Sequence, residues 1–240
     1  MNALENKTAY VTGGSKGIGF SVAESLMSEG VNVVLTSRHQ KAANEAADAL
    51  NAKGYPARAL GLEADVRNLA AQESAIALGL QEFGSIDVVV ANAGVGHFAP
   101  IQSMTSQQWQ DTIDINLTGV FNTVKASLPA LKDSKGYLFT IASLAGTNFF
   151  AGGAAYNASK FGLVGFTQAM MLDVRQEGIK VSTIMPGSVA TYFNNHTPNP
   201  SDSWKIQPED IGQIVVDLLR LPARTLPSKV EVRPSMPPQK

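Results

Sequence analysis

No cysteine occurs among the 240 residues of the chain. The protein therefore has no disulfide bond, no thiolate metal site and no cysteine nucleophile. An excess of charge is also missing, because 19 basic residues face 20 acidic ones. This balance gives no support for binding to nucleic acid or to a membrane surface.

Long apolar runs are missing too. No stretch approaches the roughly 18 apolar residues of a membrane span, and residues 1–7 are polar and lack the apolar core of a signal peptide. We therefore expect a soluble, cytoplasmic protein that binds neither nucleic acid nor membranes. The three histidines, at positions 39, 97 and 196, are scattered, so the sequence indicates no metal site.

What the chain does contain is a regular alternation of β-prone and helical segments. We expect strands at 8–11, 31–36, 57–62, 87–91, 137–141, 180–185 and 229–232, and helices at 20–29, 39–53, 69–83, 107–131, 154–177 and 208–219. The 107–131 helix is expected to bend near Gly119 and to end near Pro129.

This alternation predicts an α/β fold of the doubly wound Rossmann type, with a mostly parallel seven-stranded sheet and helices on both faces. We expect one dinucleotide-binding and catalytic domain over 1–240, since no linker or repeat interrupts the pattern. Residues 188–206 show no clear period, and residues 234–240, with three prolines, are expected to form a flexible tail.

A glycine-rich stretch, Thr12–Gly19, separates the first strand from the first helix. Gly13 permits a tight turn, Gly17 lets a phosphate approach the backbone, and Gly19 allows close packing of helix on strand. Free N–H groups at the helix N-terminus favour an anion. We expect nucleotide contacts from Gly13, Ser15, Lys16, Gly17, Ile18 and Gly19.

The second strand ends in Thr36-Ser37-Arg38, without the acidic residue that usually holds a free ribose 2′-hydroxyl. Arg38 can instead pair with a 2′-phosphate, and Lys16 and Ser37 can add hydrogen bonds. The sequence thus favours NADP(H) over NAD(H). The alternative interpretation is that Arg38 is a solvated charge at the start of a helix.

Two further strands are followed by polar or small residues. Asp65 can accept a hydrogen bond from an adenine amino group, or it can cap the next helix, and the sequence leaves both open. Asn92-Ala93-Gly94 allows the backbone to approach a flat ring or a ribose.

Tyr156 and Lys160 are four residues apart in a helical pattern, so their side chains project from nearly the same face. An ammonium close to a phenol favours the phenolate, which would lower the tyrosine pKa towards neutrality. Such a tyrosine is a usable proton donor and acceptor. Taken alone, the pair is more often a buried tyrosine beside a solvated lysine, so the rest of the chain decides.

Together these motifs resemble those of the short-chain dehydrogenase/reductase family, over about residues 7–191. The matching positions are Thr12–Gly19, Asp65, Asn92-Ala93-Gly94, Asn116, Ser143, Tyr156, Lys160, Pro186-Gly187 and Thr191. The resemblance implies that Tyr156 is the general acid/base and that Lys160 acts on both the tyrosine and the nicotinamide ribose. It also implies that Ser143 orients the carbonyl and that Asn116 holds a water in a proton relay.

The same resemblance implies cofactor contacts from Asp65, Val66, Asn92, Ala93, Gly94, Tyr156, Lys160, Pro186, Gly187, Val189 and Thr191. It makes residues 188–206 a substrate lid. We expect substrate contacts from Ser143, Leu144, Phe150, Tyr156, Tyr192 and Phe193. These aromatics indicate an apolar pocket, or else they pack the lid onto the body.

The expected function is that of an NADP(H)-dependent oxidoreductase acting on a small-molecule ketone, aldehyde or secondary alcohol. One alternative is a 3-oxoacyl-(acyl-carrier-protein) or thioester reductase, although the chain lacks a glycine-rich ending and a dense basic patch. Another is a non-catalytic NADP-binding sensor or scaffold, although Asn116, Ser143, Tyr156 and Lys160 are all present. Family members commonly assemble through two long helices, so we expect a homodimer or homotetramer through 107–131 and 154–177.

Overall fold

The computed structural model describes residues 4–236. Seven strands form one sheet in the order β3-β2-β1-β4-β5-β6-β7, and every neighbouring pair is parallel. The strands are β1 (Thr8–Thr12), β2 (Asn32–Ser37), β3 (Ala59–Glu63), β4 (Val88–Ala91), β5 (Tyr137–Ile141), β6 (Lys180–Pro186) and β7 (Lys229–Val232). The predicted doubly wound fold is therefore confirmed.

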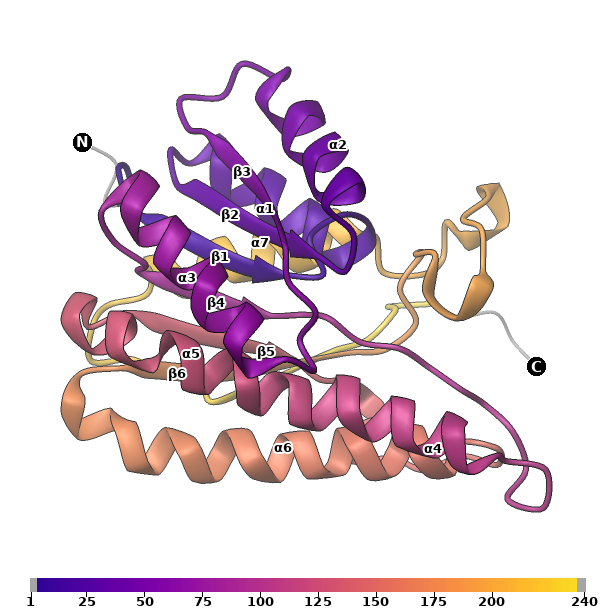
Figure 1. Cartoon of the computed structure of the whole chain (residues 1–240). Helices are drawn as coiled ribbons and strands as arrows, with labels where there is room; N and C mark the ends of the chain where they lie inside the picture. The colour runs from indigo at the N-terminus through magenta and orange to yellow at the C-terminus, as the bar shows by residue number, and fades with distance from the viewer. Residues whose placement is uncertain (1–3, 237–240) are drawn as a thin grey trace.

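Helices cover both faces of the sheet (Figure 1). They are α1 (Gly17–Ser28), α2 (Gln40–Asn51), α3 (Leu69–Phe83), α4 (Ser106–Ile113), α5 (Gly119–Ser134), α6 (Ala154–Val174) and α7 (Pro208–Arg220). The buried side chains of α1, α2 and α7 form one apolar cluster, and those of α3, α5 and α6 form another. No helix within residues 4–236 is long and apolar enough to cross a membrane.

The interior strand β1 is buried on both faces of the sheet. Ala9 and Val11 belong to the first cluster, and Tyr10, between them, belongs to the second. Successive side chains of a strand point to opposite faces, so consecutive residues of a strand with helices on both sides are buried, and its middle is mainly apolar.

The long helix predicted for 107–131 differs from expectation. The irregularity expected at Gly119 is a π-helical segment, Asp114–Thr118, that joins α4 to α5. The helix does not end near Pro129 but runs on to Ser134, and Lys135 then takes a left-handed conformation with φ 49°. Ala130 and Leu131, just after the proline, are buried in the second cluster, and this packing outweighs the local cost of a proline in a helix.

Several other boundaries differ from the predicted ones by one to three residues. The first helix begins at Gly17 rather than at Phe20, so the glycine-rich stretch itself supplies its first turn. The third strand begins at Ala59 rather than at residue 57. The ends of helices depend on capping residues, and the ends of strands depend on the neighbouring strands with which they pair. The spacing of apolar residues within a segment reveals neither.

The fold gathers the loops that follow β1, β4, β5 and β6 at one edge of the sheet. Figure 1 shows the expected lid, residues 188–206 in orange, beyond this edge. At the end of the chain, Pro234 lies against Gly187, where its Cδ would be 3.2 Å from an added Cβ. Of the tail predicted to be flexible, residues 237–240 lie outside the described part of the chain.

Candidate active site

The loops at the carboxyl ends of the strands enclose a cavity of about 1530 Å³. Small-molecule sites are typically about 300–1,000 Å³, so this cavity has room for a large cofactor together with a second molecule. The predicted site residues that line it are Gly13, Ser15, Lys16, Gly17, Ile18, Ser37, Arg38, Asp65, Val66, Asn92, Ala93, Gly94, Ser143, Leu144, Phe150, Tyr156, Lys160, Pro186, Gly187, Val189, Thr191, Tyr192 and Phe193. The two predicted residues outside this lining are Gly19 and Asn116.

The glycine-rich loop has the backbone that its sequence predicts. Gly13 and Gly17 have φ of 64° and 59°, in the left-handed region that favours glycine. A Cβ on Gly19 would lie 2.4 Å from the Gly13 carbonyl oxygen. Gly19 therefore lies behind the loop, where it allows the close packing of α1.

Asn92 connects the loop after β4 to the loop after β1. Its side-chain Nδ2 donates to the carbonyl oxygens of Thr12, at 2.9 Å, and Gly13, at 3.1 Å. The Thr12 hydroxyl in turn accepts from the backbone N–H groups of Asn92 and Ala93. These bonds fix the two strand ends at the point where the strand order reverses, which is where doubly wound folds bind ligands.

Cationic side chains mark one end of the cavity. Lys16 and Arg38 are both exposed and both line it. The arginine ion pairs within residues 4–236 involve Arg58, Arg67, Arg220 and Arg233. Arg38 forms no such pair, although its charge contributes to lowering the pKa of the nearby Asp65 carboxyl. Its guanidinium can therefore still bind an anion through two hydrogen bonds.

Asp65 does not cap the helix that follows it. The cap of α3 is Asn68, whose side chain accepts from the Ala71 N–H at 3.2 Å. Asp65 is held instead by Arg67, with an Nη2–Oδ2 distance of 2.6 Å, and hydrogen bonds from Arg67 lower the pKa of the Asp65 carboxyl despite its partial burial. The capping alternative is therefore wrong, and the adenine contact stays a prediction.

The Lys160 amine is buried beneath the centre of the site. Only 4% of the residue is exposed, and Nζ donates to the Ile141 carbonyl at 3.0 Å. Burial lowers the pKa of Lys160 to about 8, because an apolar environment disfavours the charged form.

Tyr156 stands beside this amine but does not respond to it as predicted. The Lys160 Nζ lies 5.7 Å from the centroid of the Tyr156 ring and is directed at a carbonyl rather than at the phenol. Burial raises the pKa of Tyr156, and a side-chain hydrogen bond with Ser143 acts in the lowering direction. The expected downward shift caused by Lys160 is therefore contradicted.

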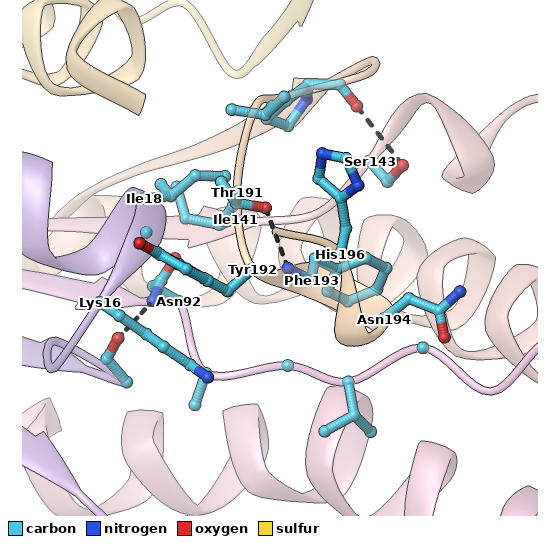
Figure 2. Close-up of a pocket in the computed structure, with 18 of the residues that line it drawn as sticks. Lys16, Ile18, Asn92, Ile141, Ser143, Thr191, Tyr192, Phe193, Asn194 and His196 are labelled. Carbon is cyan, nitrogen blue, oxygen red and sulfur yellow. Dashed lines mark hydrogen bonds between the residues drawn. The ribbon is translucent and has the colours of Figure 1, made fainter. Parts of the chain in front are cut away.

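Ser143 follows β5 and is anchored on two sides. Its hydroxyl accepts from the Ala145 N–H at 3.1 Å and is within 3.4 Å of the Pro186 carbonyl, to which it donates (Figure 2). The side chain is thus fixed between the loops after β5 and β6, next to Tyr156.

Asn116 lies behind the cavity, within the π-helical segment, and is fully buried. Its Oδ1 accepts from the Val95 N–H at 2.8 Å, and its Nδ2 donates to the Val95 carbonyl and to the Ser159 hydroxyl. Both amide N–H groups are used, so the side chain ties the loop after β4 to the helix that carries Lys160. The predicted water-holding role stays a prediction.

Four aromatic rings surround the reactive end of the cavity. The Phe98 ring lies 5.3 Å from that of Tyr156, 5.6 Å from that of Phe150 and 6.2 Å from that of Phe193. The Tyr156 and Phe193 rings are 5.6 Å apart. The sequence analysis missed Phe98, because in this loop it considered only Asn92-Ala93-Gly94 as a contact region. The available signal was the position of Phe98, four residues after Gly94 in a loop that follows a strand.

The lid 188–206 folds over the glycine-rich loop. The Tyr192 ring lies 5.8 Å from the Lys16 Nζ, and the Phe193 N–H donates to the Thr191 hydroxyl. Figure 2 shows Tyr192 of the lid near Ile18 and Lys16, and His196 directed towards Ser143. The two ends of the lid pair with each other, since Ala190 N–H donates to the Ile206 carbonyl at 2.9 Å.

The sequence of this chain is similar to those of known proteins over nearly its whole length. The family model described as short chain dehydrogenase matches residues 7–201. An uncharacterized oxidoreductase of Staphylococcus aureus is 33% identical over 235 residues, covering 98% of this chain and all of that protein.

Two solved structures are also similar over nearly their whole length. An alcohol dehydrogenase from the archaeon Thermococcus sibiricus, complexed with 5-hydroxy-NADP, has a TM-score of 0.88 at 27% identity and covers 98% of this chain and 99% of its own. A metagenomic short-chain oxidoreductase in complex with NADP has a TM-score of 0.83 at 34% identity, with the same coverage.

Proposed function

This chain belongs to the short-chain dehydrogenase family, and on that premise we propose that it is an NADP(H)-dependent oxidoreductase. The reaction is hydride transfer between the nicotinamide and a ketone or aldehyde, or a secondary alcohol in the reverse direction. The observation that carries the proposal is that Ser143, Tyr156 and Lys160 line the same cavity as the glycine-rich loop. Proton-transfer groups and a nucleotide cradle are needed together for this chemistry.

The residues at the strand ends suit a dinucleotide. The left-handed glycines and the free N–H groups at the start of α1 would hold the pyrophosphate. Gly94 is exposed, and an added Cβ there would lie 3.8 Å from the Lys160 Nζ, so glycine leaves room beside the amine for the nicotinamide ribose. When bound, the nicotinamide supplies or accepts the hydride.

The choice of NADP(H) rests on Arg38. Its guanidinium is exposed at the cationic end of the cavity, and a guanidinium can bind a 2′-phosphate through two hydrogen bonds. The cofactors in both similar structures, NADP and 5-hydroxy-NADP, agree with this assignment.

Tyr156 is proposed as the proton donor to the carbonyl oxygen. Because burial raises the pKa of Tyr156, the phenol is protonated at neutral pH, as an acid must be for carbonyl reduction. Ser143, fixed beside it, would donate a hydrogen bond to the same oxygen and stabilise its developing negative charge. Lys160 would hold the ribose and replenish the tyrosine proton.

The decisive experiment is NADPH oxidation with a panel of ketones, aldehydes, 3-oxo thioesters and quinones. We expect turnover by the wild type and a loss of about 10²–10⁴-fold in kcat for Tyr156→Phe, the usual contribution of a general acid. NADPH binding, followed by its fluorescence, should be retained in the variant. Tyr55→Phe is a matched control, because that hydroxyl bonds Glu24 far from the cavity lining.

The alternatives give other outcomes in the same experiment. Turnover confined to 3-oxo thioesters would favour the thioester reductase. Binding of NADPH without turnover of any carbonyl would overturn the oxidoreductase proposal and favour the sensor.

We also propose that the chain acts as a single catalytic domain in a homodimer or homotetramer. Large apolar side chains are exposed along the long helices, including Trp109 on α4, Phe121 on α5, and Phe161 and Leu172 on α6. Exposed apolar surface of this kind marks interaction sites. A cytoplasmic location remains a prediction from the sequence.

A further inference from the structure

The aromatic rings around Tyr156 form one substrate-facing surface, which we call the ring cluster: Phe98, Phe150 and Phe193. Each ring follows a different strand, β4, β5 or β6. Phe98 contacts both other phenylalanines edge-on, and both Phe98 and Phe193 contact the ring of Tyr156. The cluster therefore borders the phenol from several sides.

These rings are not core residues. The exposed fractions are 39% for Phe98, 47% for Phe150 and 36% for Phe193, although each ring packs against another. All three line the cavity, so a bound molecule can cover apolar surface that is now open to water. Each Å² covered contributes about 25 cal/mol.

The ionisable groups of the cavity lie elsewhere or are already engaged. Arg38, Glu45 and Asp65 belong to the elements at the nucleotide end. Lys205 is bound to Asp202, and Arg233 is bound to Glu231. His196 is bonded to Asp202 as well. Lys16 and His39 lie at the nucleotide end, and the buried Lys160 amine donates to the Ile141 carbonyl. The His97 imidazole is the remaining ionisable lining group near the cluster that is not engaged in this way.

An anionic substrate would therefore lose hydration here without gaining a dedicated cation, which is unfavourable for a buried charge. A flat apolar ring, by contrast, can stack or pack edge-on against the phenylalanines.

The position of the Phe193 ring depends on Gly96, in the loop after β4. An added Cβ on Gly96 would lie 2.5 Å from the Phe193 Cζ and 3.0 Å from the Phe98 Cζ. The lid ring thus fits against Phe98 and Tyr156 only because residue 96 has no side chain. Gly96 and Phe98 therefore determine substrate specificity by fixing the position of the Phe193 ring.

From these observations we propose that the substrate is an uncharged aryl ketone or aryl aldehyde, whose ring is held by Phe98, Phe150 and Phe193 while its carbonyl faces Tyr156 and Ser143. This proposal rests on the oxidoreductase function proposed above. Reduction adds a hydride to the carbonyl carbon and a proton from Tyr156 to the oxygen, and it converts NADPH to NADP⁺ and the carbonyl compound to the aryl alcohol.

The test compares kcat/KM within matched pairs of substrates, with NADPH as the reductant. We expect 4-methylacetophenone to exceed 4-acetylbenzoate, which differs chiefly in charge, by about 100-fold or more. Acetophenone should exceed 2-butanone by roughly 50- to 100-fold, as expected for burying a phenyl group.

Variants then connect the preference to the ring cluster. Phe98→Leu and Phe193→Leu should each reduce the acetophenone/2-butanone ratio about tenfold, with NADPH binding unchanged. Gly96→Ala, which keeps an ordinary backbone conformation, should reduce the same ratio by displacing Phe193. Phe83→Leu is the control, since this ring on α3 lies outside the cavity lining and its loss should leave the ratio intact.

The two proposals fail in different ways. Turnover of no carbonyl at all would overturn the oxidoreductase function itself. Efficient reduction of 4-acetylbenzoate or 2-butanone, at rates equal to those of their partners, would leave the oxidoreductase in place and overturn the aryl substrate class. The aryl substrate class would also be overturned if Phe98→Leu and Phe193→Leu kept the wild-type ratio of kcat/KM for acetophenone over 2-butanone.

Discussion

At the scale of single residues, Arg38 is the side chain that we propose selects NADP(H) over NAD(H). Arg38 follows β2, is exposed and lines the cavity. The tripeptide Thr36-Ser37-Arg38 contains no acidic residue. A cation at this position attracts a 2′-phosphate, whereas a carboxylate would repel it and accept from a ribose hydroxyl instead.

We therefore expect Arg38→Asp to weaken NADPH binding by about 10- to 100-fold, the usual range for a charged hydrogen-bonded contact, and to reverse the preference between NADPH and NADH. The measurement is a fluorescence titration of both cofactors. Arg224→Asp makes the same change in net charge at an exposed arginine that follows α7 and lies outside the cavity lining, so it serves as the control. If Arg38→Asp and the wild type had the same ratio of affinities for NADPH and NADH, the assignment of Arg38 to the 2′-phosphate would be wrong.

Residue-level prediction from sequence works where the determinants are local. The glycines of the loop could be assigned because turn geometry and helix packing depend on neighbours in the chain. Gly13 and Gly17 have a left-handed φ, and Gly19 packs closely against Gly13. The electrostatics could not be assigned in this way. Lys160, on α6, donates to Ile141 at the end of β5, and burial dominates the pKa of Tyr156.

At the scale of elements, the lid 188–206 has its own internal support. The Asp202 carboxylate, 5% exposed, bonds the Lys205 Nζ at 2.6 Å, the His196 Nε2 at 2.5 Å and the Asn199 N–H at 3.1 Å. Hydrogen bonds from Lys205 and then from His196 lower the pKa of Asp202 to about 2. A lowered carboxyl pKa stabilises the fold above its unfolded value, near 4, and this contribution is lost as pH falls towards 2.

Asp202→Asn should therefore loosen the lid without unfolding the sheet. We expect faster hydrogen–deuterium exchange across 188–206 and a several-fold higher KM for the carbonyl substrate, with exchange in β1–β5 unchanged. Asp217→Asn on α7, where the carboxylate accepts from Gln213 on the same helix, serves as the control. Unchanged exchange of the lid in Asp202→Asn would mean that the ion pairs do not hold it.

Helices and strands whose apolar residues recur at regular spacing could be predicted from the sequence. Segments without such regular spacing could not. The seven strands and the helices at 69–83 and 208–219 follow from apolar patterns and caps within each segment. The π-helical segment 114–118 and the passage of α5 through Pro129 depend on packing against other elements. The lid has no period because its order comes from contacts such as those of Asp202 rather than from repeating backbone structure.

At the scale of the whole molecule, the buried amine of Lys160 affects global stability. Its pKa is about 8 in the folded protein against an ordinary value of 10.5. Below pH 8 the amine is protonated in both states, and the folded state bears a penalty of about 3 kcal/mol for the buried charge. Between pH 8 and 10.5 the unfolded state binds more protons than the folded state, so the free energy of unfolding rises with pH.

Lys160→Met should therefore be more stable than the wild type at pH 7, by about 2 kcal/mol once loss of the hydrogen bond to Ile141 is counted. The advantage should shrink as the pH rises from 8 to 10. Urea unfolding at several pH values measures both, and Lys125→Met, at an exposed lysine of α5, should show no such trend. A constant difference between Lys160→Met and wild type across this range would contradict the buried-charge explanation.

The order of the strands also has a consequence for synthesis on the ribosome. The chain supplies β1, β2 and β3 first, but the loops that meet at Tyr156 come after β4, β5 and β6, and Pro234 reaches the cavity only after β7. At roughly 5–20 residues per second, the glycine-rich loop precedes Tyr156 by on the order of ten seconds. A nascent chain thus presents the glycine-rich turn well before Tyr156 has been synthesised. Assembly in this order keeps the reactive phenol and the nucleotide cradle apart until most of the sheet is available to join them.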